Sequence, residues 1–186
     1  MTEVEWLAAT DPRPLLKFLR GRVSDRKLRL FAAGCWRRRR GAPARGPVEW
    51  VIRKAERLAD GAYARQEKDR GWLLLQTNAY QVAAASGRHL AALRGPGRVP
   101  PDEQAGLLRD VVEPFRAAAW DPRWRTADAV GLARGIYEDR AFDRLPLLAD
   151  ALLDAGCDRG DILGQCRSDG PHVRGCWVVD LVLGKE

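Results

Sequence analysis

The segment SDRKLRLFAAGCWRR, residues 24–38, decides the fold of this chain. Its apolar positions recur three, four, seven and eight residues after the first, and they are Leu28, Phe31, Ala32, Cys35 and Trp36. This spacing places them on one face of an α-helix with about 3.6 residues per turn. Continuing the same periodicity would bring Arg39 onto the apolar face, so we expect the helix to end near Arg38. The periodicity also assigns Cys35 to the core.

Helix start and stop signals continue on both sides of this segment. Thr2 and Glu5 form a capping box, in which each side chain accepts a hydrogen bond from the other residue's backbone N–H. Asp11 before Pro12, and Pro47, mark two more helix starts. Further helices are predicted at 72–93, 101–112, 126–137, 143–155, 158–165 and 171–183.

The last of these segments is ambiguous, because residues 176–183 are apolar on nearly every side and could form a buried strand. We prefer a buried helix, since Pro171 suits a helix start, Gly184 suits a helix stop, and no partner strand is evident. The sequence therefore predicts an all-α fold. We expect a compact bundle of about eight to ten helices, arranged either as one domain or as two helical subdomains.

Charge is distributed unevenly along the 186 residues, whose net charge is +7. Residues 1–45 carry +8, residues 46–100 carry +4, and residues 101–186 carry −5. Glycine and proline cluster in residues 94–101, which is the clearest loop of the chain. We therefore predict a basic helical half at 1–93, a loop at 94–101 and an acidic helical half at 102–186.

Composition indicates a folded protein of the cytoplasm. Hydrophobic residues make up 46% of the chain and seven residues are tryptophans, which predicts a substantial core. The acidic start of the sequence is unlike a secretory signal, and no apolar run is long enough to span a bilayer. Four cysteines without an export signal fit a reducing compartment, in which thiols stay free or bind metal. We expect no association with membranes.

The tail of the chain concentrates metal-ligating residue types in the pattern C-x8-C-x5-H-x3-C. Zinc prefers four sulfur and nitrogen ligands in tetrahedral geometry. If 171–183 is one helix, His172 and Cys176 share a face, since they are four positions apart. The predicted ligands are Cys157, Cys166, His172 and Cys176. The alternative, which we favour from sequence, is three packed core thiols and one surface imidazole.

A second reading of the tail is catalytic. Cys166 and His172 flank the short segment 167–171, and a nucleophilic thiolate needs a base within hydrogen-bond reach. Asp169 is the nearest candidate for the group that orients the base. Nearness in sequence is weak evidence for such geometry, and no recognised catalytic or nucleotide-binding motif occurs elsewhere. We therefore expect binding more than catalysis.

Arginine and lysine residues form a basic patch near Trp36, and arginine pairs bidentately with phosphate. An indole close by could stack on an unpaired base. The alternative is a solvated helix end whose cations favour the helix dipole. The leading functional hypothesis is an interaction or regulatory module that binds nucleic acid or an acidic protein, with a zinc-stabilised structural or adaptor module second and a thiol-dependent enzyme third. The predicted contacts are Arg26, Lys27, Arg29, Arg37, Arg38, Arg39, Arg40 and Arg45.

Several stretches resemble a known group of bacterial proteins. They are AFDRLP (141–146), LADAL (148–152), DAGC (154–157) and PHVRGCW (171–177), with EWL (5–7) and SDRKLRLF (24–31) near the start. This pattern is similar to an uncharacterised planctomycete-type family that occurs in many copies per genome. The resemblance implies a bacterial origin and carries no activity. The group often has histidine where this chain has Gln165, which leaves the four predicted ligands intact.

Overall fold

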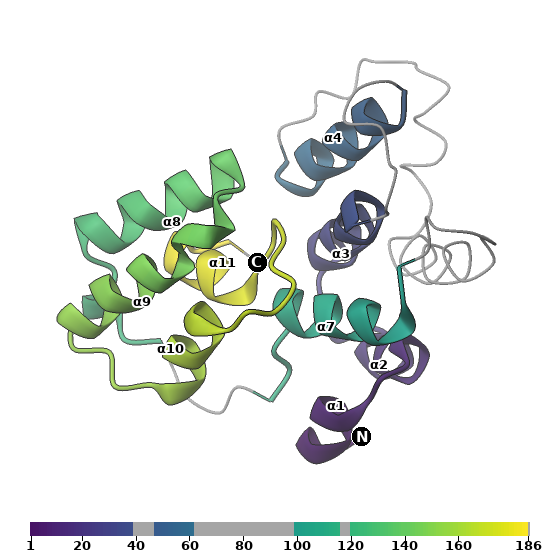
Figure 1. Cartoon of the computed structure of the whole chain (residues 1–186), viewed down its shortest axis with the longest axis horizontal. Coiled ribbons are helices and arrows are strands. Elements are labelled where there is room, and N and C mark those ends of the chain that lie inside the picture. The colour runs from purple at the N-terminus through teal and green to yellow at the C-terminus, as the bar shows by residue number, and fades with distance from the viewer. Residues whose placement is uncertain (39–46, 62–98, 116–119, 186) are drawn as a thin grey trace. The chain divides into compact units, whose positions relative to one another are not determined.

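The structure is a computed structural model, and it describes residues 1–38, 47–61, 99–115 and 120–185. Within these ranges it contains nine α-helices, two 3-10 helices and no strand (Figure 1). The predicted all-α fold of eight to ten helices is confirmed. None of the described helices combines the length and the apolar character that crossing a bilayer requires. The predicted helix at 72–93 and most of the predicted loop at 94–101 lie outside the described residues.

The chain divides into two units, Met1–Arg109 and Asp110–Glu186. The division falls inside α7 (Pro101–Val111), two residues before its end. The first unit contains α1 (Glu3–Ala8), α2 (Pro12–Leu19), α3 (Asp25–Arg38), α4 (Pro47–Ala59) and most of α7 (Pro101–Val111).

Helix α3 forms where the periodicity places it, and it ends at Arg38. Leu28, Phe31 and Cys35 of its apolar stripe are buried, with Phe31 and Cys35 fully inaccessible. Helix α3 packs against α4. The capping box predicted at the start of the chain is present in α1. Thr2 Oγ1 accepts a hydrogen bond from the Glu5 N–H at 3.2 Å, and Glu5 Oε2 accepts one from the Thr2 N–H at 2.7 Å.

After the end of α7, the described residues of the second unit contain four α-helices and two single-turn 3-10 helices. They are α8 (Ala127–Asp139), α9 (Leu145–Asp154), α10 (Gly160–Arg167), α11 (Trp177–Leu183), η1 (Pro122–Trp124) and η2 (Phe142–Arg144). Helix α11 packs against α8, and α9 packs against both α8 and α10 (Figure 1). Their shared core is apolar and includes Ile136, Leu148, Leu152, Val178 and Val182.

The predicted helix at 171–183 is wrong over its first half. The helix begins only at Trp177, and residues 168–176 form an irregular loop that we call the tail loop. Gly175 has a φ of 98°, a left-handed conformation that glycine adopts readily and that interrupts a right-handed helix. His172 and Cys176 therefore do not share a helical face. The preference for helix over strand in the last segment is confirmed for Trp177–Leu183.

Candidate metal centre

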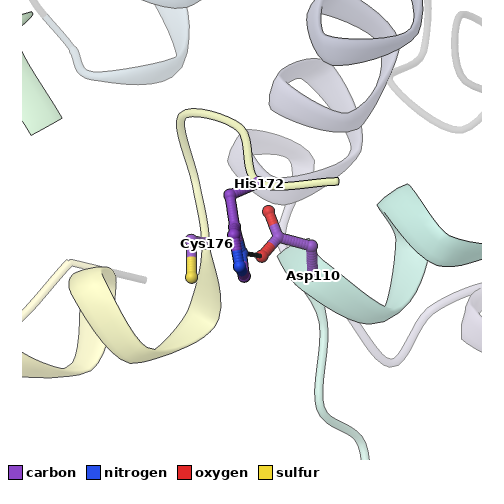
Figure 2. Close-up of side chains that lie close together, drawn as sticks. All are labelled: Asp110, His172 and Cys176. Carbon is purple, nitrogen blue, oxygen red and sulfur yellow. Dashed lines mark hydrogen bonds and ion pairs between the residues drawn. The ribbon is translucent and has the colours of Figure 1, made fainter. Parts of the chain in front are cut away.

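Three side chains of different chemistry meet in the second unit. Asp110, His172 and Cys176 each offer one ligand atom, and these atoms all lie within 4.8 Å of one another (Figure 2). Asp110 is the penultimate residue of α7, His172 lies on the tail loop, and Cys176 immediately precedes α11. We call this set the DHC site.

The Asp110 carboxylate organises the tail loop. It is 2% exposed, and a buried carboxylate is stable only when hydrogen bonds replace its lost hydration. Oδ1 accepts from His172 Nδ1 at 2.7 Å and from Gln165 Nε2 at 2.8 Å, while Oδ2 accepts from the Val173 N–H at 2.8 Å. These bonds fix both the ring and the backbone of the loop. They also satisfy the Val173 backbone N–H, which would have no partner inside a helix that began at residue 171.

Both ring nitrogens of His172 face acceptors. Nδ1 meets the Asp110 carboxylate, and Nε2 lies 3.0 Å from the Ser168 carbonyl oxygen. Ser168 Oγ is 3.3 Å from Nε2, but it also lies 3.0 Å from the Gln165 carbonyl oxygen, to which it donates. A carboxylate and a carbonyl only accept, so this arrangement suits a ring protonated on both nitrogens. A metal ion at this position would replace one of these protons.

The Cys176 thiol is fully buried. Burial raises the pKa of this thiol well above its ordinary value, and the negative charge of Asp110 raises it further. Its backbone N–H donates to the Val173 carbonyl at 3.0 Å, which closes the tail loop onto α11. A neutral thiol is therefore the stable form without a cation. A bound divalent ion reverses this electrostatic balance, because it favours the thiolate.

The donor set of the DHC site is one oxygen, one nitrogen and one sulfur. Calcium and magnesium prefer shells made of oxygen, whereas imidazole and thiolate suit zinc and other late first-row metals. Zinc accepts carboxylate, imidazole and thiolate together at about 2.0 to 2.3 Å. The chemistry of the DHC site therefore fits zinc best.

Two of the four ligands predicted from sequence, His172 and Cys176, belong to the DHC site. Cys157 and Cys166 are not part of the group within 4.8 Å, although both are buried in the core of the same unit. Asp110 was not predicted, because it lies 62 residues before His172 in the sequence. One signal could have found it: Asp110 follows Leu107 by three positions, which places a charged residue on the apolar stripe of α7.

The proposed catalytic pair of Cys166 and His172 lacks the electrostatics of an activated nucleophile. Burial raises the pKa of Cys166 to about 12, with further increases from the charges of Cys157 and Asp110. Reactive cysteines need the opposite shift. The carboxylate that hydrogen-bonds His172 is Asp110, whereas the sequence suggested the exposed Asp169.

Part of the predicted basic patch is used inside the first unit. Arg37 pairs with Glu49 at 3.0 Å and with Glu56 at 2.7 Å, which joins α3 to α4. Other members also form ion pairs, Arg38 with Glu103 at 2.7 Å and Arg26 with Asp60 at 3.4 Å. Lys27 and Arg29 on α3 are half-buried, and Arg39, Arg40 and Arg45 lie outside the described residues.

Comparison with known proteins gives no assignment. No family model matches the chain, and neither a curated protein nor a solved structure matches it. The resemblance to the planctomycete-type family therefore stays a prediction. The chemistry of the DHC site carries the proposed function.

Proposed function

We propose that the second unit is a metal-stabilised structural module in which the DHC site binds zinc. The observation that carries this proposal is the convergence of Asp110, His172 and Cys176 within 4.8 Å. Carboxylate oxygen, imidazole nitrogen and thiol sulfur in one place form a zinc donor set. The proposed site keeps His172 and Cys176 of the four ligands predicted from sequence, and it has Asp110 where the prediction had Cys157 and Cys166.

A metal at the DHC site would join three segments of backbone. Asp110 belongs to α7, while His172 and Cys176 lie before α11 on a loop without regular structure. Such a loop has no internal ladder of hydrogen bonds, so its order depends on what its side chains contact. A ligand that binds only the folded arrangement adds its binding free energy to folding.

The burial of the ligands supports a structural role over a catalytic one. The side chains of Asp110 and His172 are 2% and 8% exposed, and Cys176 is fully buried. Structural zinc sites are closed by protein ligands, whereas catalytic sites keep one position open to water or substrate. The DHC ligands are largely buried, as those of a structural site are, and they supply three of the four ligands that such a site takes.

Metal analysis of the full chain tests this proposal. We expect about one equivalent of zinc after reconstitution and removal of excess metal, and a higher midpoint of thermal unfolding than for chelator-treated protein. Cys176→Ser should lose both effects, because serine is a poor zinc ligand. Cys35→Ser is the matched control, since Cys35 is an equally buried thiol in the first unit. Wild-type protein that retains no metal, with no change in unfolding midpoint, would refute the proposal.

The interaction module with an arginine-rich surface stays a prediction. Arg26, Arg37 and Arg38 already pair with carboxylates of the first unit. A nucleic acid or acidic protein would have to compete with those carboxylates for the same guanidinium groups. Contact with such a partner is therefore best tested at other basic residues of the patch.

A further inference from the structure

The orientation of the His172 imidazole decides through which nitrogen the ring can bind an ion. Its two nitrogens point toward opposite edges of the ring, so one ion coordinates one of them. In metal-binding histidines, the hydrogen bond made by the other nitrogen selects the one that coordinates. The contacts of Nδ1 and Nε2 therefore carry information about the metal centre.

Ser168 holds the Nε2 edge of the ring. It is the C-cap residue of α10, and its carbonyl and hydroxyl oxygens lie 3.0 Å and 3.3 Å from His172 Nε2. A carbonyl oxygen only accepts hydrogen bonds, and the Ser168 hydroxyl donates its proton to the Gln165 carbonyl oxygen at 3.0 Å. Both Ser168 oxygens are therefore acceptors toward the ring. This arrangement keeps a proton on Nε2 and keeps a metal ion off it.

The Nδ1 edge of the ring is directed at the carboxylate of the DHC site. Nδ1 lies 2.7 Å from Asp110 Oδ1 (Figure 2). An ion on Nδ1 can bind Asp110 as well, whereas an ion on Nε2 would lie on the opposite edge, against Ser168. Tetrahedral zinc with bonds of about 2.0 to 2.2 Å holds two such ligand atoms about 3.3 Å apart. The contact between Nδ1 and Oδ1 therefore has to open slightly when an ion takes the place of the hydrogen bond.

Gln165 keeps the Asp110 carboxylate in place when the hydrogen bond from His172 is lost. The Gln165 amide donates from Nε2 to Oδ1 at 2.8 Å, and the Val173 N–H donates to Oδ2 at 2.8 Å. Each carboxylate oxygen has about two acceptor positions, so an ion on Oδ1 leaves both of these hydrogen bonds intact. Gln165 belongs to α10, so its contact with Asp110 comes from a helix and not from the tail loop.

For the zinc site proposed above, on which this inference rests, we propose that the ion binds His172 through Nδ1. Ser168 fixes the tautomer of the ring by accepting from Nε2, and Gln165 is a positioning residue that directs Asp110 toward the ion. Groups outside the coordination shell orient the ligands of metal sites in this manner. The ion takes the place of the hydrogen bond between His172 and Asp110, with Cys176 as the third ligand.

NMR of the full chain loaded with an NMR-active cadmium isotope tests the assignment, because one-bond coupling to the metal identifies the coordinated nitrogen. The chain contains two histidines, so isotope labelling of histidine nitrogen alone gives a simple spectrum. We expect coupling at Nδ1 of His172, with Nε2 still protonated. His89→Gln is the control that assigns the signals, and it should leave this coupling unchanged. His89 lies outside the described residues.

The outcomes separate this inference from the proposed function. Coupling at Nε2 in place of Nδ1 would overturn the assignment and keep the DHC site. Bound cadmium without coupling to either nitrogen of His172 would overturn the assignment and remove His172 from the ligands. Failure of folded wild-type protein to bind cadmium or zinc would overturn the proposed function, and the assignment with it.

Gln165→Met tests the positioning role, because methionine has a similar length and cannot donate a hydrogen bond to Asp110. Loss of such an outer contact weakens metal binding by about 10- to 100-fold, and we expect a rise of this size in the zinc dissociation constant, measured by competition with a chromophoric chelator. Gln104→Met is the matched control. Gln104 is 1% exposed in the first unit, and its amide donates to the Val99 carbonyl at 2.9 Å. A lower unfolding midpoint of Gln165→Met with an unchanged zinc dissociation constant would overturn the positioning role.

Discussion

At the scale of single residues, Asp110 holds the tail loop and α10 through three hydrogen bonds to its carboxylate. A carboxylate at 2% exposure loses its hydration, and that cost is offset only where donors replace the water. Three donors do so here, from a ring nitrogen, an amide and a backbone N–H. Hydrogen bonds to ionised groups are stronger than neutral ones, so the carboxylate stabilises the tail loop even before a metal binds.

Asp110→Asn tests this role with almost no change in side-chain volume. The amide keeps one acceptor but loses the charge, so we expect the free energy of unfolding to fall by about 2 kcal/mol in urea titrations of metal-free protein. Asp150→Asn is the control, because Asp150 is 64% exposed and its pair with Arg167 contributes about 0.5 kcal/mol or less. Equal effects of the two substitutions would contradict the assigned role. In zinc-loaded protein, Asp110→Asn should also weaken metal binding.

At the scale of elements, a charge network joins α3 to α4. Arg37 lies at the end of α3 and bridges Glu49 and Glu56 of α4. The Glu56 side chain is 2% exposed, so its charge depends on donors within the fold. Arg37, the first residue of the basic run after Trp36, therefore stabilises the contact between α3 and α4.

Arg37→Ala should destabilise the protein more than Arg38→Ala. Removing Arg37 takes two hydrogen bonds from the buried Glu56 carboxylate, and we expect a loss of about 2 kcal/mol in the free energy of unfolding. Arg38 and Glu103 are 46% and 28% exposed, and loss of that pair should cost about 0.5 kcal/mol. Chemical denaturation of both variants beside wild type measures the difference. A larger loss for Arg38→Ala would show that the α3–α4 network is not the stabilising contact.

At the scale of the whole molecule, charge and metal chemistry belong to different parts of the chain. The excess of positive charge lies in residues 1–100, whereas the DHC site belongs to the unit Asp110–Glu186. The basic segment and the proposed metal site can therefore be tested separately. Substitutions in the basic segment should leave metal binding unchanged, and substitutions at the DHC site should leave polyanion binding unchanged.

Polyanion binding by the basic half has a clear expected form. If the basic half binds nucleic acid, the affinity for single-stranded or duplex nucleic acid should fall steeply as the salt concentration rises. In the triple variant Arg39→Ala/Arg40→Ala/Arg45→Ala, the slope of log K against log salt should become shallower by about 3 units. This variant spares Arg37, whose loss would confuse binding with stability. Fluorescence anisotropy over a salt series measures it. Binding that is absent or independent of salt would rule the hypothesis out, and Cys176→Ser should bind as wild type does.

Much of the fold was predictable because helix signals act locally. The capping box at Thr2, the proline at the start of α2 and the stripe of α3 each depend on residues within one or two turns. The tail loop was not predictable in this way. The hydrogen bond from Val173 to Asp110 spans 63 residues, which is beyond the reach of local helix signals.

The sequence alone determined an all-α chain, the ends of α3, and the presence of thiols and an imidazole in the tail. Only the tertiary structure decided which of these side chains meet, and that their partner is a carboxylate from α7. The physical reason is the range of the interactions. Helix periodicity and capping are set by neighbours in sequence, whereas a cluster of ligand atoms exists only where packing brings distant segments together.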